Sequence, residues 1–314
     1  MLRPFVSRSQ LLFFSFLLVA SPGCSGERAP RSTSTNAPYA FERPSATYEL
    51  PEELEEISGL TRVSENLLAA IQDEDGIIFF IDAENGEVLQ QVEFEGPGDY
   101  EGIEAVGEDV FVMNSGGTLF RVSGWEGSSL QSERIETPLD ARCDAEGLGY
   151  DHSRDRLLLA CKEDPGRDVE DGRAIYGYDV GASVFEPEPA YVLDFRARGS
   201  GRGGSEDNLG ELVEEFHNLP GNGVDATALK PSAVAAHPVT GEVYVLSSAG
   251  PEMVVLDNNG EPRDVWALPR DQLPQPEGLA FLENGDLFIS TEKRGRRPGR
   301  IYRYTYRPRG VHTE

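Results

Sequence analysis

Three glutamates occupy the same position of a phrase that recurs along the chain, and their side chains could bind a metal ion. The phrase is Glu-Gly followed by an apolar residue, at Glu101, Glu146 and Glu277, and two further copies carry Ser58 and Ser232 at the acidic position. Oxygen ligands without histidine or cysteine suit a hard cation, and Ca²⁺ tolerates irregular carboxylate geometry better than Mg²⁺. If the fold brings these five side chains together, we expect a calcium site there.

The same pattern also has a purely structural interpretation. Carboxylates that converge on one point repel each other, so they acquire raised pKa values, accept hydrogen bonds from backbone amides, or bind a cation. Each glutamate could therefore bond the backbone of the next repeat and hold two repeats together. Both interpretations remain open at the level of sequence.

The spacing of the phrases indicates the elements that position them. Successive copies lie 43 or 45 residues apart, except for one interval of about twice that length. A glycine that leads into an apolar strand follows each copy. A period in the low forties with several short strands per unit is typical of a propeller blade. The sequence thus predicts an all-β, five-bladed β-propeller whose first strands line a central channel and carry the candidate ligands.

The first unit illustrates the expected blade. Its strands are predicted at 57–63, 66–71, 76–82 and 88–94, with an Asn-Gly turn before the fourth strand. The fifth unit ends after three strands, and residues 47–50 could supply the missing outer strand and close the ring.

The long interval leaves a six-bladed alternative. Residues 196–229 contain neither recurring phrase, so we interpret them as an insertion on one face, with a short helix at 211–218.

The N-terminus resembles a lipoprotein signal peptide. Arg3 and Arg8 precede an apolar run at 11–20, which is too short to span a bilayer, and Gly23 precedes Cys24. We expect residues 1–23 to be removed and Cys24 to be lipidated; ordinary secretion with cleavage nearby is the alternative.

This interpretation divides the chain and places it outside the cytoplasm. Residues 24–46, rich in Ser, Thr, Pro and Ala, would form a flexible tether, 47–308 the propeller and 309–314 a tail. Serine rather than aspartate after Cys24 favours the outer membrane or periplasm over the inner membrane.

The charge balance excludes some partners. The chain carries 55 acidic against 28 basic residues, a formal net charge of −27. Such a surface repels nucleic acid and anionic lipid, so we expect no nucleic-acid partner and no membrane contact beyond the lipid anchor. Cys143 and Cys161 flank a predicted hairpin and would lie nearly opposite each other, as a disulfide or as two separate buried thiols.

A second set of polar residues follows the second strand of each unit and would surround one mouth of the channel. These residues suit a binding surface, and they are equally consistent with ordinary turns. No nucleophile elbow and no local Ser–His or Cys–His pairing occurs, so the sequence does not favour an enzyme. The set consists of Asp73, Glu74, Asn114, Lys162, Glu163, Ser247, Ser248, Thr291 and Glu292.

Taken in order, several stretches resemble the SdiA-regulated family of bacterial envelope proteins, which is distantly related to NHL-repeat propellers. The resemblance implies a five-bladed propeller with a calcium site and no established biochemical activity. It implies Glu101, Glu146 and Glu277 as ligands and adds Glu56, whereas Asn-Ser-Gly at 114–116 departs from the more acidic pattern. The matching stretches are 56–60, 72–74, 98–103, 145–148, 159–163, 230–234 and 275–279.

These observations predict a monomeric, envelope-anchored propeller that binds Ca²⁺ in its channel and a protein or small molecule of unidentified class. The alternative is a metal-dependent hydrolase, similar to a lactonase or phosphoesterase, in which the channel cation activates water. A third interpretation is a scaffold for protein contacts. An open coordination position on the cation would separate the first two.

Overall fold

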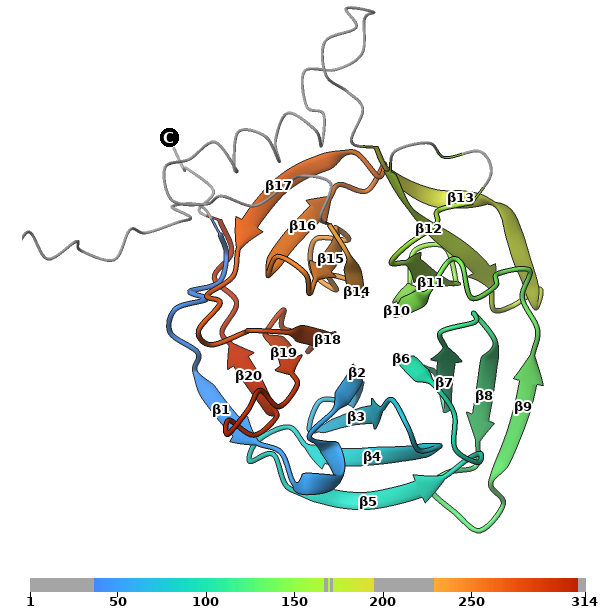
Figure 1. Ribbon diagram of the computed structural model, residues 1–314, viewed down its shortest axis with the longest axis horizontal. Helices are drawn as coiled ribbons and strands as arrows, with labels where there is room; N and C mark the ends of the chain where they lie inside the picture. Colours follow the sequence, from blue (N-terminus) through green and yellow to red (C-terminus); the bar gives the residue numbers. More distant parts are fainter. Residues whose placement is uncertain (1–36, 167–168, 170–171, 195–228, 310–314) are drawn as a thin grey trace, which may run out of the picture. The chain divides into compact units, whose positions relative to one another are not determined.

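The computed structural model describes residues 37–166, 169, 172–194 and 229–309, which form five four-stranded antiparallel sheets around a common axis (Figure 1). The predicted five-bladed β-propeller is confirmed. Blades one and two consist of β2 (Ile57–Ser64), β3 (Leu67–Gln72), β4 (Ile77–Asp82) and β5 (Val88–Glu93), then β6 (Tyr100–Val106), β7 (Asp109–Asn114), β8 (Leu119–Ser123) and β9 (Gln131–Ile135). Blade three consists of β10 (Ala145–Asp151), β11 (Arg156–Cys161), β12 (Gly172–Asp179) and β13 (Val184–Asp194). Blades four and five consist of β14 (Pro231–Ala236), β15 (Val243–Ser247), β16 (Glu252–Leu256) and β17 (Pro262–Ala267), then β18 (Pro276–Phe281), β19 (Leu287–Thr291), β20 (Arg300–Tyr304) and β1 (Ala46–Glu49).

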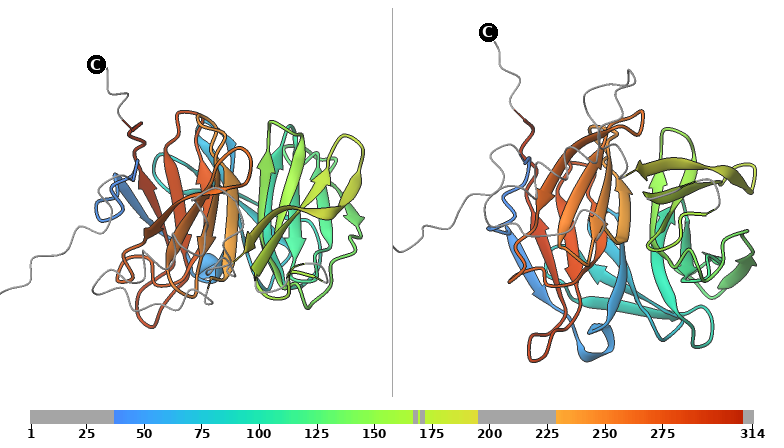
Figure 2. Two further views of the ribbon diagram at one scale, coloured as in Figure 1. Left: turned by 90° about the horizontal axis from the view of Figure 1, so that it is seen from above. Right: turned by 45° about the horizontal axis from the view of Figure 1, so that its top comes forward.

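The first strand of each blade lies next to the axis (Figure 1), and the view turned by 90° shows the strands of the blades running roughly along it (Figure 2, left). Each inner strand contacts the next, in the order β2, β6, β10, β14, β18 and back to β2. The ring therefore passes from blade three to blade four with no further sheet between them, and the six-bladed alternative is wrong. The helix predicted at 211–218 lies outside the described residues.

Strand β1 completes blade five. This confirms the prediction that a segment before blade one supplies the missing outer strand. It pairs antiparallel with β20, with Ala46 opposite Arg303 and Glu49 opposite Arg300. The pairing covers the edge that β20 would otherwise expose. A 3₁₀ turn, Glu52–Leu54, then leads into blade one.

The folded domain begins earlier than the sequence predicted. Tyr39 and Phe41 are buried among residues of blades four and five, and the Tyr39 hydroxyl donates a hydrogen bond of 2.7 Å to the carbonyl of Gly285. The last part of the predicted tether is thus packed against the propeller. Burial of its two aromatic side chains stabilises the folded state. Residues 24–36 lie outside the described part of the chain.

The glycine of the recurring phrase is explained by the close approach of neighbouring inner strands. A Cβ atom on Gly102 would lie 2.6 Å from the Cβ of Leu148, and one on Gly278 would lie 2.6 Å from the Cβ of Leu60. In this phrase the apolar residue of one blade packs on the glycine of the preceding blade. That contact leaves no room for a side chain at the glycine of the phrase.

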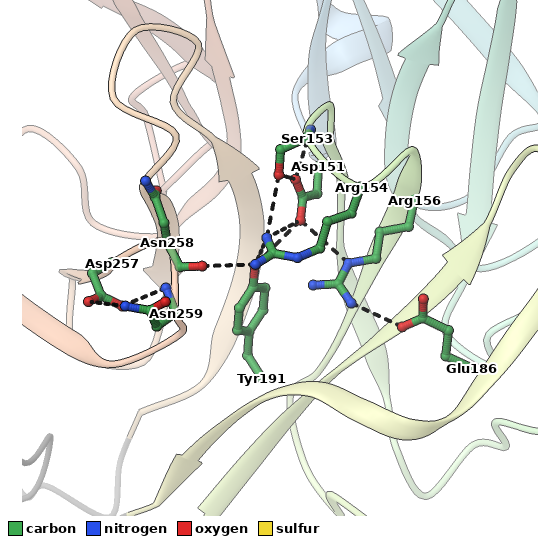
Figure 3. Close-up of polar contacts among 9 residues, drawn as sticks. All are labelled: Asp151, Ser153, Arg154, Arg156, Glu186, Tyr191, Asp257, Asn258 and Asn259. Carbon is green, nitrogen blue, oxygen red and sulfur yellow. Dashed lines mark hydrogen bonds and ion pairs between the residues drawn. The ribbon is translucent and has the colours of Figure 1, made fainter.

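Away from the axis, blades three and four are joined by a polar network (Figure 3). Arg154 donates from Nη1 to Asp151, at 3.0 Å, and from Nη2 to the carbonyl of Asn258 in blade four, at 2.9 Å. Arg156 pairs with Glu186 at 3.0 Å and with Asp151 at 3.4 Å. In the described part of the chain, we find no helix with the length and hydrophobicity of a membrane span.

Candidate functional site

The structure brings the five predicted ligand positions to one small cavity on the axis. The cavity has a volume of about 10 Å³, which is room for roughly one water molecule or one ion. It is lined by Ser58, Glu101, Glu146, Ser232 and Glu277, together with the glycine, alanine and apolar residues that follow them.

A β-bulge marks the candidate position in every blade. The ladder between the first and second strands shifts register between Ile57 and Gly59, and the same shift occurs at the equivalent place in the other four blades. In each case the residue skipped by the ladder is the Ser or Glu that lines the cavity. A bulge re-aims the side chain of the extra residue, so five equivalent irregularities turn these side chains towards the axis.

The two serines use their hydroxyl groups to hold neighbouring blades together. Ser58 donates to the carbonyl of Tyr100 at 2.7 Å, and Ser232 donates to the carbonyl of Pro276 at 2.8 Å. The inter-blade contact that the sequence allowed for the glutamates is thus made by the serines. Their role as calcium ligands stays a prediction.

The glutamates are less well satisfied. Glu146 pairs through Oε1 with the ammonium group of Lys162, while its buried Oε2 has no hydrogen-bond partner among the described residues. Lys162 belongs to the second set of polar residues predicted from the sequence. The carboxyl groups of Glu101 and Glu277 form no hydrogen bond or ion pair with the described part of the chain, and Glu277 is only 9% exposed.

Burial and mutual repulsion disfavour the ionised carboxylates. Burial, together with the charges of Glu146 and Asp99, raises the pKa of Glu101 to about 9. Burial raises the pKa of Glu146 to about 7, although its hydrogen bond and ion pair with Lys162 lower it. Burial and the charge of Glu146 hold the pKa of Glu277 well above its ordinary range. A positive charge in the cavity would stabilise the ionised forms.

Further carboxylates surround the mouth beside this cavity. Burial raises the pKa of Glu292 to about 7, with contributions from Asp73 and Glu56, and burial followed by the charge of Glu56 raises the pKa of Asp73. Glu56, the ligand added by the resemblance, is exposed at this mouth and does not line the cavity. Asn114 instead accepts a hydrogen bond from the backbone N–H of Thr118 in the turn that follows it, and Thr291 donates one to the carbonyl of Gln275, just before the first strand of blade five.

The donor set fits a hard cation in its chemistry, although the carboxylates stand apart from one another. It consists of oxygen atoms alone, and one buried carboxylate oxygen, Oε2 of Glu146, lacks a partner in the described part of the chain. Within the described residues, no three acidic, histidine or cysteine side chains converge closely enough to hold a metal ion as they stand. The glutamates would have to rotate inward around an ion.

A disulfide lies beside the site. Cys143 and Cys161 are bonded to each other, and Cys161 pairs with Ala145 across the β10–β11 ladder. Since Lys162 follows Cys161 directly, this crosslink holds the end of β11 next to Glu146. The predicted lipidation site, Cys24, lies outside the described residues.

The opposite end of the channel contains a second cavity, which the repeated phrase did not predict. It has a volume of about 40 Å³ and is lined by Thr61, Arg62, Glu104 and His152, among others. The Thr61 hydroxyl donates to Glu104 at 3.1 Å, and burial raises the pKa of Glu104 to about 8. Thr61 and Glu104 lie three residues beyond Ser58 and Glu101 on the same strands. That repeated offset is the signal by which they could have been found.

Comparison with known proteins identifies the family. The sequence profile of the SdiA-regulated family matches residues 45–173 and 211–304. The chain belongs to the SdiA-regulated family. No curated protein sequence matches it.

A solved structure shares the fold of this SdiA-regulated protein at low sequence identity. A crystal structure of glutaminyl cyclase from Myxococcus xanthus matches with a TM-score of 0.53 at 14% identity, over 84% of this chain and 95% of that chain. A luciferin-regenerating enzyme matches with a TM-score of 0.48 at 11% identity, over 86% of this chain and 96% of that chain. At such identities the likeness extends to the fold alone.

Proposed function

We propose that this protein is a lipid-anchored, extracytoplasmic binding propeller that takes up Ca²⁺ in its central channel and presents the surrounding mouth to a protein or small-molecule partner. The cation would join three blades at the axis. It would supply a fixed positive charge beneath the acidic mouth.

One observation carries the calcium proposal. Glu101, Glu146 and Glu277 come from three different blades, lie at equivalent β-bulges and line a single cavity of ionic size. Glu146 and Glu277 are buried and Glu101 is half-buried, and they lack enough positive charge around them, since among the described residues Lys162 alone forms an ion pair with any of the three. An all-oxygen donor set with flexible side chains favours Ca²⁺ over Zn²⁺, which prefers nitrogen and sulfur, and over Mg²⁺, which demands regular octahedral geometry.

Calorimetric titration of chelator-treated protein with CaCl₂ tests the proposal. We expect one binding event and a rise in the melting temperature with calcium concentration, because a ligand that binds only the folded state stabilises it. The variants Glu101→Gln, Glu146→Gln and Glu277→Gln should each weaken binding.

Glu133→Gln, an exposed position on β9, is the matched control and should bind like the wild type. Absence of both heat and thermal stabilisation in the wild type would reject calcium as the channel ligand.

The anchoring part of the proposal rests on the N-terminal sequence and has its own test. In cells of a Gram-negative host, wild-type protein should sediment with membranes and incorporate labelled fatty acid. Cys24→Ala should lose the label and appear in the soluble extracytoplasmic fraction. An unlabelled wild type would leave ordinary secretion as the explanation of the leader.

A further inference from the structure

Lysine is rare in this acidic chain, and each lysine pairs with a glutamate. The sequence contains three, Lys162, Lys230 and Lys293. Lys230 pairs with Glu163 and Lys293 pairs with Glu55 near the rim, whereas the partner of Lys162 is Glu146 in the channel. Lys162 is thus the lysine whose ammonium group is paired with a cavity-lining carboxylate.

The position of Lys162 is fixed by its neighbours in the chain. It follows β11 immediately after Cys161, and the disulfide to Cys143 holds this strand end against β10, where Glu146 lies. Its backbone N–H donates to the carbonyl of Asp144 at 3.0 Å. The main chain therefore stays in place while the long side chain, 29% exposed, keeps room to move.

The ammonium group acts on the whole ring of carboxylates. Its charge lowers the pKa values of Glu101, Glu146, Glu277 and Glu292, which burial otherwise raises. A single cationic side chain thus influences all four carboxyl groups. Its effect on these pKa values has the same sign as that of a bound cation.

We propose that Lys162 is the resident cation of the channel and that it competes with Ca²⁺ for Glu146. The inference rests on the calcium site proposed above. One oxygen of Glu146 is already taken by the ammonium group, and the other is buried without a partner among the described residues. Glu146 lines the cavity and Lys162 is bonded to it, so a divalent ion bound by Glu146 would lie close to the ammonium group, and the two positive charges would repel each other.

Calcium entry would therefore release the Lys162 side chain towards the mouth. Asp144 and Glu163 are acidic neighbours on its own segment. After Glu146 and Glu277, the charge of Asp144 also raises the pKa of Lys162. The pKa of Glu163, which Lys230 lowers most, is also lowered by Lys162. Binding of an ion at the axis would thus be reported at the rim as the movement of one charged side chain.

The test compares three lysine-to-methionine variants by calcium calorimetry after chelation. Lys162→Met removes the competing charge and keeps a side chain of similar length, so calcium should bind roughly tenfold more tightly or better than in wild type. Lys230→Met and Lys293→Met remove equivalent ion pairs outside the cavity and should leave the affinity unchanged. Lys162→Arg keeps the charge and should bind no more tightly than the wild type.

A measurement on the wild type covers the case in which Lys162→Met does not fold. With three lysines in the chain, the side-chain signals of ¹³C-lysine-labelled protein are few enough to assign by NMR. Titration with CaCl₂ should shift the Lys162 signals and leave those of Lys230 and Lys293 in place.

The outcomes separate this inference from the calcium proposal. Equal calcium affinity in wild type and Lys162→Met, or a Lys162 signal that calcium leaves unmoved, overturns the inference while the calcium site stands. Binding by Lys162→Met alone supports the inference and shows that the wild-type channel excludes calcium. Binding by neither protein overturns both.

Discussion

The two ends of strand β10 bury a carboxylate in opposite ways. Glu146 near its start is 7% exposed and Asp151 at its end is 4% exposed, so both have lost most of their contact with water. Within the described residues, Glu146 has one cationic partner and one oxygen without any partner. Asp151 accepts hydrogen bonds from Ser153 and Arg154 and pairs in addition with Arg156 (Figure 3).

The pKa values of the two groups move in opposite directions. Burial raises the pKa of Glu146 to about 7 because its single partner does not compensate for the lost solvation. Burial also acts to raise the pKa of Asp151, but the bonds from Ser153 and Arg154 and the guanidinium charges outweigh it, and the pKa is lowered. A buried carboxylate whose oxygens all have polar partners, such as Asp151, joins neighbouring blades. A buried carboxylate with an oxygen that lacks a partner, such as Glu146, is available to bind a ligand.

Removal of the disulfide tests how much the channel end of β10 depends on its crosslink. The bond closes a segment with a sequence separation of 18, so Cys143→Ala with Cys161→Ala should lower the free energy of unfolding by about 3 kcal/mol. Urea denaturation of the double variant measures this. Wild-type protein, unfolded without reductant, should show no free thiol from these two residues; two thiols would contradict the crosslink.

Loss of the charge at the other end of β10 should have the next largest effect. Asp151→Asn leaves Arg154 and Arg156 without their shared counter-charge and should cost roughly 2–3 kcal/mol of unfolding free energy. Asp140→Asn, which breaks an exposed pair with Arg142, is the matched control and should leave stability unchanged. Equal urea midpoints for the two variants would mean that the buried ion pairs of Asp151 contribute no more to stability than the exposed pair of Asp140.

The buried carboxyl group of Glu104, at the far end of the channel, should make the free energy of unfolding depend on pH. Because burial raises the folded-state pKa of Glu104 from 4.5 to about 8, the folded protein keeps a proton that the unfolded chain releases between these values. Stability from this group is therefore present below pH 4.5 and is lost as the pH rises towards 8, by about 1.4 kcal/mol per pH unit.

Glu104→Gln should remove that slope. Urea denaturation at intervals between the two pKa values, with Glu133→Gln as the exposed control, measures it. An unchanged slope in Glu104→Gln would mean that this carboxyl group titrates normally in the folded protein.

Substitution of the two serines should have the smallest effect on stability. It distinguishes a serine that only joins neighbouring blades from one that binds calcium. Ser58→Ala and Ser232→Ala each remove a buried hydroxyl that bonds the next blade, which should cost about 1 kcal/mol of unfolding free energy. Calcium affinity should stay at the wild-type value if these hydroxyls only join blades. A clear loss of affinity would restore the ligand role that the sequence suggested.

Much of the fold was predictable because the repeat is local and periodic. The Glu-Gly phrase and the Gly-led strand place each blade, and the three-strand final unit predicts the closing strand β1. The packed segment around Tyr39 and Phe41 was not predictable, since its binding surface is formed by residues roughly 200 or more positions away in the chain.

The candidate site, like the fold, was predictable only in part. The sequence by itself determined which residues occupy equivalent positions around the axis, because a repeated phrase repeats its geometry. Only the tertiary structure decided what those residues do: Ser58 and Ser232 bond neighbouring blades, and Glu146 meets Lys162. These outcomes depend on distances between blades and on the burial of each charge, and neither quantity is set by the spacing of residues along a single strand.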